Sequence, residues 1–358
     1  MKKRTIFSIL LIVFMAMPLM VFSGCDIIDT ILASEPPPPP GYYDEIEEPE
    51  PEPEPVELTE AEAEWLNLSA WEQRFRSMPM AFGFANKDGN KLIHVFYGYE
   101  ELVQAAEEEA AATEDPVETD EDTDEEEDAP NNYFAITGFD PDRYSLAIGP
   151  FGDIRQISFA FLQDEGRGNN GREIATNFDR LPGFVFAQKQ WKLAKNKMHL
   201  MTEMSALLDN IVAIGSPGWK GNTPPMEEET IESIEKHKER KVEWGKTLAV
   251  TLVDEALIGL VLYERQGNDM LFSIVYMDEE KTLFWDNPAE YDEESTWRTD
   301  AGEEPGQFEP LILARFDEGL MLMLIWSASD GDIAVTLYEE DGVFKEAEDL
   351  SFFRKTSG

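Results

Sequence analysis

The chain has 358 residues, and its 74 Asp and Glu residues against 29 Lys and Arg residues give a formal net charge of −45 at pH 7. So acidic a chain is not expected to bind nucleic acid or to lie directly on anionic lipid, because both need a cationic surface. Its single cysteine, Cys25, excludes a disulfide within the chain and a zinc site built from several thiolates.

The first 25 residues have the layout of an export signal. Basic residues at positions 2–4 precede the apolar run TIFSILLIVFMAMPLMVF, and two small residues then precede Cys25. This is the pattern of a secretory signal peptide. The stretch Phe22–Cys25 resembles the lipobox of bacterial lipoproteins, with Phe22 in the place where leucine is usual. The resemblance implies that residues 1–24 are removed and that Cys25 is lipidated and becomes the new N-terminus.

A lipid on Cys25 implies that the membrane is a partner of the protein, through two acyl chains that give stable anchoring. The resemblance therefore predicts a lipid-anchored protein that faces the extracytoplasmic side of the cell membrane. Two alternatives remain. The apolar run of 18 residues is at the lower limit of a membrane-spanning helix, and a plain secreted protein would begin in a similar way.

Two acidic stretches account for much of the charge. Residues 26–64 contain 14 acidic and no basic residues, with the repeat EPEPEPEP among them. Such prolines favour an extended conformation, so residues 25–58 are predicted to be a disordered acidic spacer behind the lipid. Residues 100–128 contain 16 acidic and no basic residues, and a disordered acidic insert is predicted at 106–130. The rest of the exported chain carries a net charge of about −18.

The first folded half, residues 59–215, is predicted to begin with a helix. A capping box at Thr59–Glu62 precedes an aromatic stripe at helical spacing that includes Trp71 and Phe75. The stripe would pack on a sheet or, as the less favoured alternative, form a binding face. A hairpin turning at Asp88-Gly89 and three further strands follow. Residues 184–210 resemble one long amphipathic helix.

The second folded half, residues 216–358, repeats this order loosely. A helix is predicted from the prolines at 224–225 to Gly245, with acids in its first turn and bases near its end. Six apolar strands separated by turns then follow, with a polar loop among them. The predicted fold class is therefore α+β, mainly antiparallel β meanders with a few helices, in two similar halves.

No catalytic or metal-binding pattern stands out. The three histidines lack the spacing of a helical metal site. The match of Ser233 and Lys236 to the S-x-x-K motif of penicillin-recognising enzymes lies in a strongly charged helix, unlike the buried helix of that family. One stretch of the acidic insert resembles the start of a calcium-binding loop, but it lacks the glycine and the final glutamate that such a loop needs. No catalytic residue, metal site or cofactor is predicted.

Three tryptophans are the candidate ligand-binding residues. Trp219 lies in a Gly/Pro-rich stretch, and Trp285 and Trp297 flank a polar segment. Loop aromatics can stack on sugars or hold a partner peptide. The alternative is that each tryptophan covers the core.

These features favour a noncatalytic binding or scaffold domain of the cell envelope, with an envelope protein or a polysaccharide as partner. One alternative is a solute-binding lipoprotein of a transporter, and another is an extracytoplasmic hydrolase.

Overall fold

The computed structural model describes five stretches of the chain, residues 68–96, 139–217, 223–291, 307–328 and 330–356. The chain divides between Leu58 and Thr59, and every described residue belongs to the second unit. The predicted signal peptide, the lipidated Cys25, the acidic spacer and the acidic insert all lie outside the described residues. The described part is mainly antiparallel β with few helices, as the sequence predicts.

Six antiparallel strands close into a barrel, in the order β1-β2-β5-β4-β3-β6. The strands are β1 (Met80–Ala85), β2 (Lys91–Val95), β3 (Leu146–Gly149), β4 (Asp153–Gln163), β5 (Gly183–Gln188) and β6 (Met198–Thr202). Each strand contributes buried residues to one apolar cluster, in which Ala85 and Phe186 take part. Because all six strands meet in this cluster, it fills the barrel interior. The predicted hairpin at Asp88-Gly89 is confirmed, with Gly89 at a φ of 70°.

The prediction of one helix over residues 184–210 is wrong. These residues form β5, β6, the short helices α5 (Met204–Leu207) and η5 (Leu208–Asn210), and the connections between them. Phe184 and Phe186 lie in the interior cluster, whereas Val185 packs in a different cluster, which is the alternation of a strand. Lysine-rich residues join β5 to β6 through Asn196, whose φ is 53°. The apolar residues of two separate strands therefore show, when read together, the spacing expected of an amphipathic helix.

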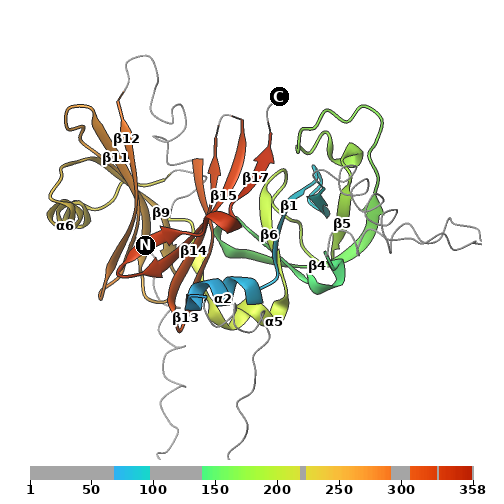
Figure 1. Ribbon diagram of the computed structural model, residues 1–358, viewed down its shortest axis with the longest axis horizontal. Helices are drawn as coiled ribbons and strands as arrows, with labels where there is room; N and C mark the ends of the chain where they lie inside the picture. The colour runs from blue at the N-terminus through green and yellow to red at the C-terminus, as the bar shows by residue number, and fades with distance from the viewer. Residues whose placement is uncertain (1–67, 97–138, 218–222, 292–306, 329, 357–358) are drawn as a thin grey trace, which may run out of the picture. The chain divides into compact units, whose positions relative to one another are not determined.

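The second half of the chain forms two antiparallel sheets (Figure 1). The five-stranded sheet has the order β12-β11-β10-β9-β8 and consists of β8 (Ile214–Gly215), β9 (Val242–Thr251), β10 (Leu257–Tyr263), β11 (Asp269–Met277) and β12 (Thr282–Glu290). The six-stranded sheet has the order β16-β15-β14-β13-β7, with β17 also paired to β15, and consists of β7 (Ile211–Val212), β13 (Phe308–Phe316), β14 (Gly319–Ser327), β15 (Gly331–Glu340), β16 (Val343–Glu346) and β17 (Phe352–Lys355).

Both faces of the six-stranded sheet are buried. Along β14, Leu320, Leu322 and Leu324 pack against the five-stranded sheet. The residues between them, Met321 and Met323, pack instead in a cluster with the barrel and α2 (Ala70–Ser77). A strand buried on both faces needs a continuous apolar run, which explains the sequence LMLMLIW. The barrel and the five-stranded sheet therefore pack on opposite faces of this sheet.

The helices begin and end at different residues from those predicted. Thr59 lies outside the described residues, and α2 begins after a capping box that Ser69 and Glu72 form. Helix α6 (Glu228–Lys238) has acids in its first turn and bases in its last turn, as predicted. It ends at Glu239, which adopts a left-handed φ of 54°, and Gly245 lies within β9 instead.

The two halves do not share one architecture. The first half closes into a barrel, whereas the second forms two open sheets. Strands β7 and β8, which belong to the first half in sequence, complete the sheets of the second. Strand β12 was missed because its polar end, DNPAE, resembles a loop. Pro288 is tolerated there because β12 is an edge strand.

Candidate functional site

Of the predicted site residues, Cys25, Trp219 and Trp297 lie outside the described part of the chain. Trp285 lies in β12 rather than on a loop, and its side chain is only 8% exposed. It belongs to the core between the two sheets, with its ring centroid 6.2 Å from that of Phe272. This position favours the alternative in which Trp285 is a core residue.

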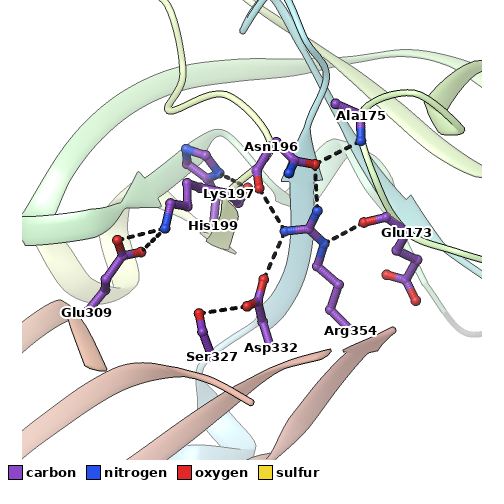
Figure 2. Close-up of polar contacts among 9 residues, drawn as sticks. All are labelled: Glu173, Ala175, Asn196, Lys197, His199, Glu309, Ser327, Asp332 and Arg354. Atoms are coloured by element: carbon purple, nitrogen blue, oxygen red, sulfur yellow. Dashed lines mark hydrogen bonds and ion pairs between the residues drawn. The ribbon is translucent and has the colours of Figure 1, made fainter. Parts of the chain in front are cut away.

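The most connected buried polar side chain is Arg354 on β17, which is 1% exposed (Figure 2). Its Nε donates to the carbonyl oxygen of Glu173 at 2.7 Å. One terminal nitrogen donates to the Asn196 carbonyl oxygen and to Asp332, both at 3.0 Å, and the other donates to the Asn196 side chain at 2.9 Å. The guanidinium also lies 4.4 Å from the ring centroid of Phe84.

This arrangement leaves Arg354 little capacity to bind a ligand. Four of the five N–H donors of a guanidinium are used in these hydrogen bonds. The carboxylate of Asp332 also accepts from Ser327 at 2.8 Å, and Asn196 Oδ1 accepts from the backbone of Ala175 at 2.8 Å. Arg354 therefore joins the six-stranded sheet to segments of the barrel half, and its role is structural.

Two buried titratable side chains lie close to this cluster (Figure 2). Burial raises the pKa of Glu173 to about 7, although the charge of Arg354 lowers it. Burial lowers the pKa of His199 to about 4, although its hydrogen bond with the Lys197 carbonyl oxygen raises it. Strongly shifted pKa values often mark functional sites. Neither side chain lines the two cavities described below, and both are almost fully buried.

One cavity lies between α2 and the segment that joins β16 to β17. It has a volume of about 420 Å³. Its aromatic lining comes from Trp71, Phe75 and Tyr338, whose ring centroids lie 5.4 to 5.6 Å apart. Its other lining residues are Glu72, Arg76, Glu346, Ala347, Glu348, Asp349 and Leu350. We call this cavity the acidic aromatic groove.

The sequence positions each wall of the groove. Trp71 and Phe75 are one helical turn apart on α2, and the Trp71 indole nitrogen donates to the carbonyl oxygen of Glu339 at 2.8 Å. This hydrogen bond fixes α2 against β15, the strand that carries Tyr338. Arg74 on the same helix pairs with Glu318 at 2.9 Å. The opposite wall is the 3-10 helix η9 (Glu348–Leu350).

A second hollow adjoins the groove and shares Asp349 and Leu350 with it. Its volume is about 240 Å³. His94 and Phe139 line this hollow, and their rings are stacked with the centroids 4.5 Å apart. Burial lowers the pKa of His94, although its hydrogen bond with the Phe82 carbonyl oxygen raises it, so a positive charge beside the acidic groove is disfavoured.

The groove was only partly predictable from the sequence. The aromatic stripe that includes Trp71 and Phe75 is visible at helical spacing, and packing on a sheet was its preferred role. Trp71 does pack in the core beside the six-stranded sheet, while Phe75 packs there and also lines the groove. Glu346 to Asp349 lie far along the chain, and no local signal pairs them with α2.

Within the residues that the structure describes, His, Asp and Glu side chains do not gather in a group of three that could hold a metal ion. No helix in these same stretches is long and apolar enough to cross a membrane. The exposed Ser233 on α6 lines none of the cavities above. Comparison of the chain with protein-family models, with curated proteins and with solved structures finds no match.

Proposed function

We propose that the protein is a lipid-anchored extracytoplasmic scaffold of the cell envelope, with the acidic aromatic groove as its binding face. The observation that carries this proposal is the groove itself, which combines aromatic rings with carboxylates on an accessible surface. Concave sites with aromatic lining and a few polar groups are typical of binding surfaces. The lipobox-like stretch ending at Cys25 and the acidic spacer supply the anchor.

A noncatalytic role agrees with the placement of the titratable groups. Glu173 and His199 have shifted pKa values but line none of the described cavities. Catalysis needs such a group within hydrogen-bond reach of a substrate. Arg354 lies beside them with most of its donors already used. These groups stabilise the fold in our proposal.

The antiparallel topology favours a scaffold over the solute-binding lipoprotein of a transporter. Solute-binding lipoproteins usually consist of two α/β lobes around a cleft. The described strands pair antiparallel, in a barrel and two sheets. The extracytoplasmic hydrolase gains little support from the two cavities, since His94 and Ser351 line the second hollow but are not hydrogen-bonded to each other: His94 Nδ1 contacts the Phe82 carbonyl oxygen, and the Ser351 hydroxyl donates to Glu346.

Retention on isolated cell envelopes tests this function when it is measured with a chain that lacks residues 1–25 and therefore carries no lipid, since the folded unit begins at Thr59. The variant Ala347→Trp would fill the groove from its rim, because Ala347 lines the groove and is only partly buried. We expect this variant to fold normally and to lose most of its retention. The control Val253→Ser changes a side chain that is 84% exposed and lies outside the groove, and it should be retained like the wild type. Equal retention of both variants would contradict the proposal.

A further inference from the structure

The loop that joins β5 to β6 is basic, in contrast to the rest of this acidic protein. Residues 189–197 read KQWKLAKNK and contain four lysines and no acid. Lys197 pairs with Glu309 at 2.7 Å. The other three, Lys189, Lys192 and Lys195, are exposed and form no salt bridge with the residues that the structure describes. The loop therefore presents three cationic side chains that pair with no acidic side chain among the described residues.

The same loop carries an exposed aromatic side chain. Trp191 is 68% exposed and lies between Lys189 and Lys192 in the sequence. A tryptophan side chain buries about 150–250 Å² when it is covered, and tryptophan is among the residue types enriched at the centres of interfaces. An exposed tryptophan between lysines thus points to a partner surface that is both aromatic and acidic.

The acidic aromatic groove has these two properties. It is lined by four carboxylates and one guanidinium, that of Arg76. Glu348 and Asp349 are exposed and form no ion pair with any described residue. The rings of Phe75 and Tyr338 add faces on which an indole can stack or over which an ammonium can lie. The groove complements the loop in charge and in apolar character.

We propose that the basic loop at 189–195 of one copy of this chain docks into the acidic aromatic groove of a second copy. Trp191 would lie against Phe75 and Tyr338, while the lysines pair with Glu348 and Asp349. This proposal rests on the proposed function, because it names the partner that the groove binds. The two patches are different, so the contact is heterologous and joins copies head to tail.

The loop cannot bind the groove of its own chain while it keeps the position observed in the structure. Leu193 N donates to the Gly89 carbonyl oxygen at 2.8 Å, and Asn196 is held by Arg354 at the other end of the loop. None of residues 189–197 lines the groove. The long acidic stretches at 26–64 and 100–128 are also unsuitable occupants, because their charge has the same sign as that of the groove.

Anchoring to a membrane would strengthen such a contact. One loop in one groove is a small interface, and charged pairs at its rim are screened by salt. Confinement of many copies to one surface raises their effective concentration and compensates for weak individual contacts. The contact should therefore be measured in the membrane, with the full chain.

Site-directed disulfide formation tests the proposal in cells that express two differently tagged full-length copies. Because the only native cysteine is Cys25, which would carry the lipid, the introduced cysteines would be the free thiols. One copy carries Gln190→Cys beside Trp191, and the other carries Ala347→Cys in the groove. We expect a mixed disulfide on mild oxidation. Ala347→Cys paired with Val253→Cys is the matched control, and it should give little product.

An exchange of charge adds a test of specificity. Lys192→Glu on the loop copy, or Glu348→Lys on the groove copy, should each lower the disulfide yield about tenfold, because like charges at an interface repel. The two changes together should restore the yield. A yield no higher than that of the Val253→Cys control, or failure of the exchange to restore it, would overturn the proposal. If Ala347→Trp abolishes envelope retention while the mixed disulfide never forms, the proposed function stands and the second copy is excluded as the partner.

Discussion

Glu173 and His199 are both held toward their neutral forms, but they respond to pH in opposite ways. Burial is the main cause in each case, since it penalises the charged form of either group. Arg354 faces Glu173 and limits the rise of its pKa, while Asp332 adds to that rise. A neutral Glu173 costs the fold less than a buried charge would, because its Oε1 has no hydrogen-bond partner among the described residues.

The shifted pKa of Glu173 predicts a specific pH dependence of stability. The folded pKa of about 7 lies above the ordinary value of 4.5, so the folded state binds more protons between these two values. Its contribution is fully present below about pH 4.5 and is lost as the pH rises through about 7. We expect Glu173→Gln to be more stable than the wild type at pH 8, by at most about 3 kcal/mol. Urea unfolding at several pH values measures this difference.

His199 provides the comparison for that experiment. Its folded pKa of about 4 lies below the ordinary 6.5, so its contribution to stability is present above about pH 6.5 and is lost as the pH falls through about 4. Subtracting the unfolding free energy of Glu173→Gln from that of the wild type cancels the His199 contribution, because both proteins contain His199. A constant difference from pH 5 to pH 8 would show that Glu173 does not titrate in this range.

At the scale of the elements, the barrel depends on a close approach of β5 to β2. A Cβ atom on Gly183 would lie 2.3 Å from the His94 carbonyl oxygen and 2.9 Å from a side-chain carbon of Ile93. Backbone cannot move away as a side chain can. We expect Gly183→Ala to destabilise the fold by about 2 kcal/mol or more, since overpacking typically costs 1–3 kcal/mol. Chemical denaturation measures the loss.

Gly259 on β10 is the matched control. There a Cβ atom would meet the terminal methyl carbon of Met226 at 1.9 Å, the flexible end of a side chain that can rotate away. The nearest backbone atom, the Lys246 carbonyl oxygen, is 3.1 Å distant. Gly259→Ala should therefore be less destabilising than Gly183→Ala. The reverse order would contradict the account of the β2–β5 contact.

The elements that could be predicted are those with a local cause. A hairpin follows from the turn residues at Asp88-Gly89, and the apolar strands follow from their short runs between turns. The helix predicted over 184–210 failed because the burial of Phe184 and Phe186 is decided by closure of the barrel. That closure pairs β1 with β6, for example Met80 with Thr202, and no local pattern encodes a partner so distant in sequence.

The candidate site likewise combines residues that a local sequence pattern predicts with residues whose position depends on distant strand pairing. Phe75 could be identified as part of an aromatic stripe because the spacing on α2 is local. Glu348 and Asp349 could not be assigned to the same groove, since their position depends on how β15 to β17 fold back beside α2. The polar residues after Trp285 predict a loop from the sequence, whereas in the structure they continue an edge strand.

At the scale of the whole molecule, the proposed anchor predicts a change of location for one substitution. Cys25→Ala removes the atom to which the lipid would be attached, and two acyl chains are what makes anchoring stable. We expect the wild type to incorporate labelled fatty acid and to sediment with membranes, and the variant to incorporate none. Metabolic labelling with an alkyne fatty acid, followed by gel fluorescence, measures this directly.

Ser23→Ala is the control for that experiment, because it keeps a small residue in the stretch before Cys25. It should be labelled and processed like the wild type. Two results would contradict the lipid anchor: absence of label from the wild type, or equal gel mobility and membrane content of wild type and Cys25→Ala. The second result would favour an uncleaved membrane helix.

The hydrogen bonds of Arg354 can form only late in the synthesis of the chain. Its partners Glu173 and Asn196 lie 181 and 158 positions earlier in the chain, so the barrel strands leave the ribosome long before the arginine is made. Contacts between residues so far apart form slowly, because the entropy of loop closure must be overcome first. Until β17 arrives, the ring of Phe82 lacks Phe352, its stacking partner at 5.4 Å. The contact between the two halves of the folded unit is therefore completed only after β17 has been made, near the end of synthesis.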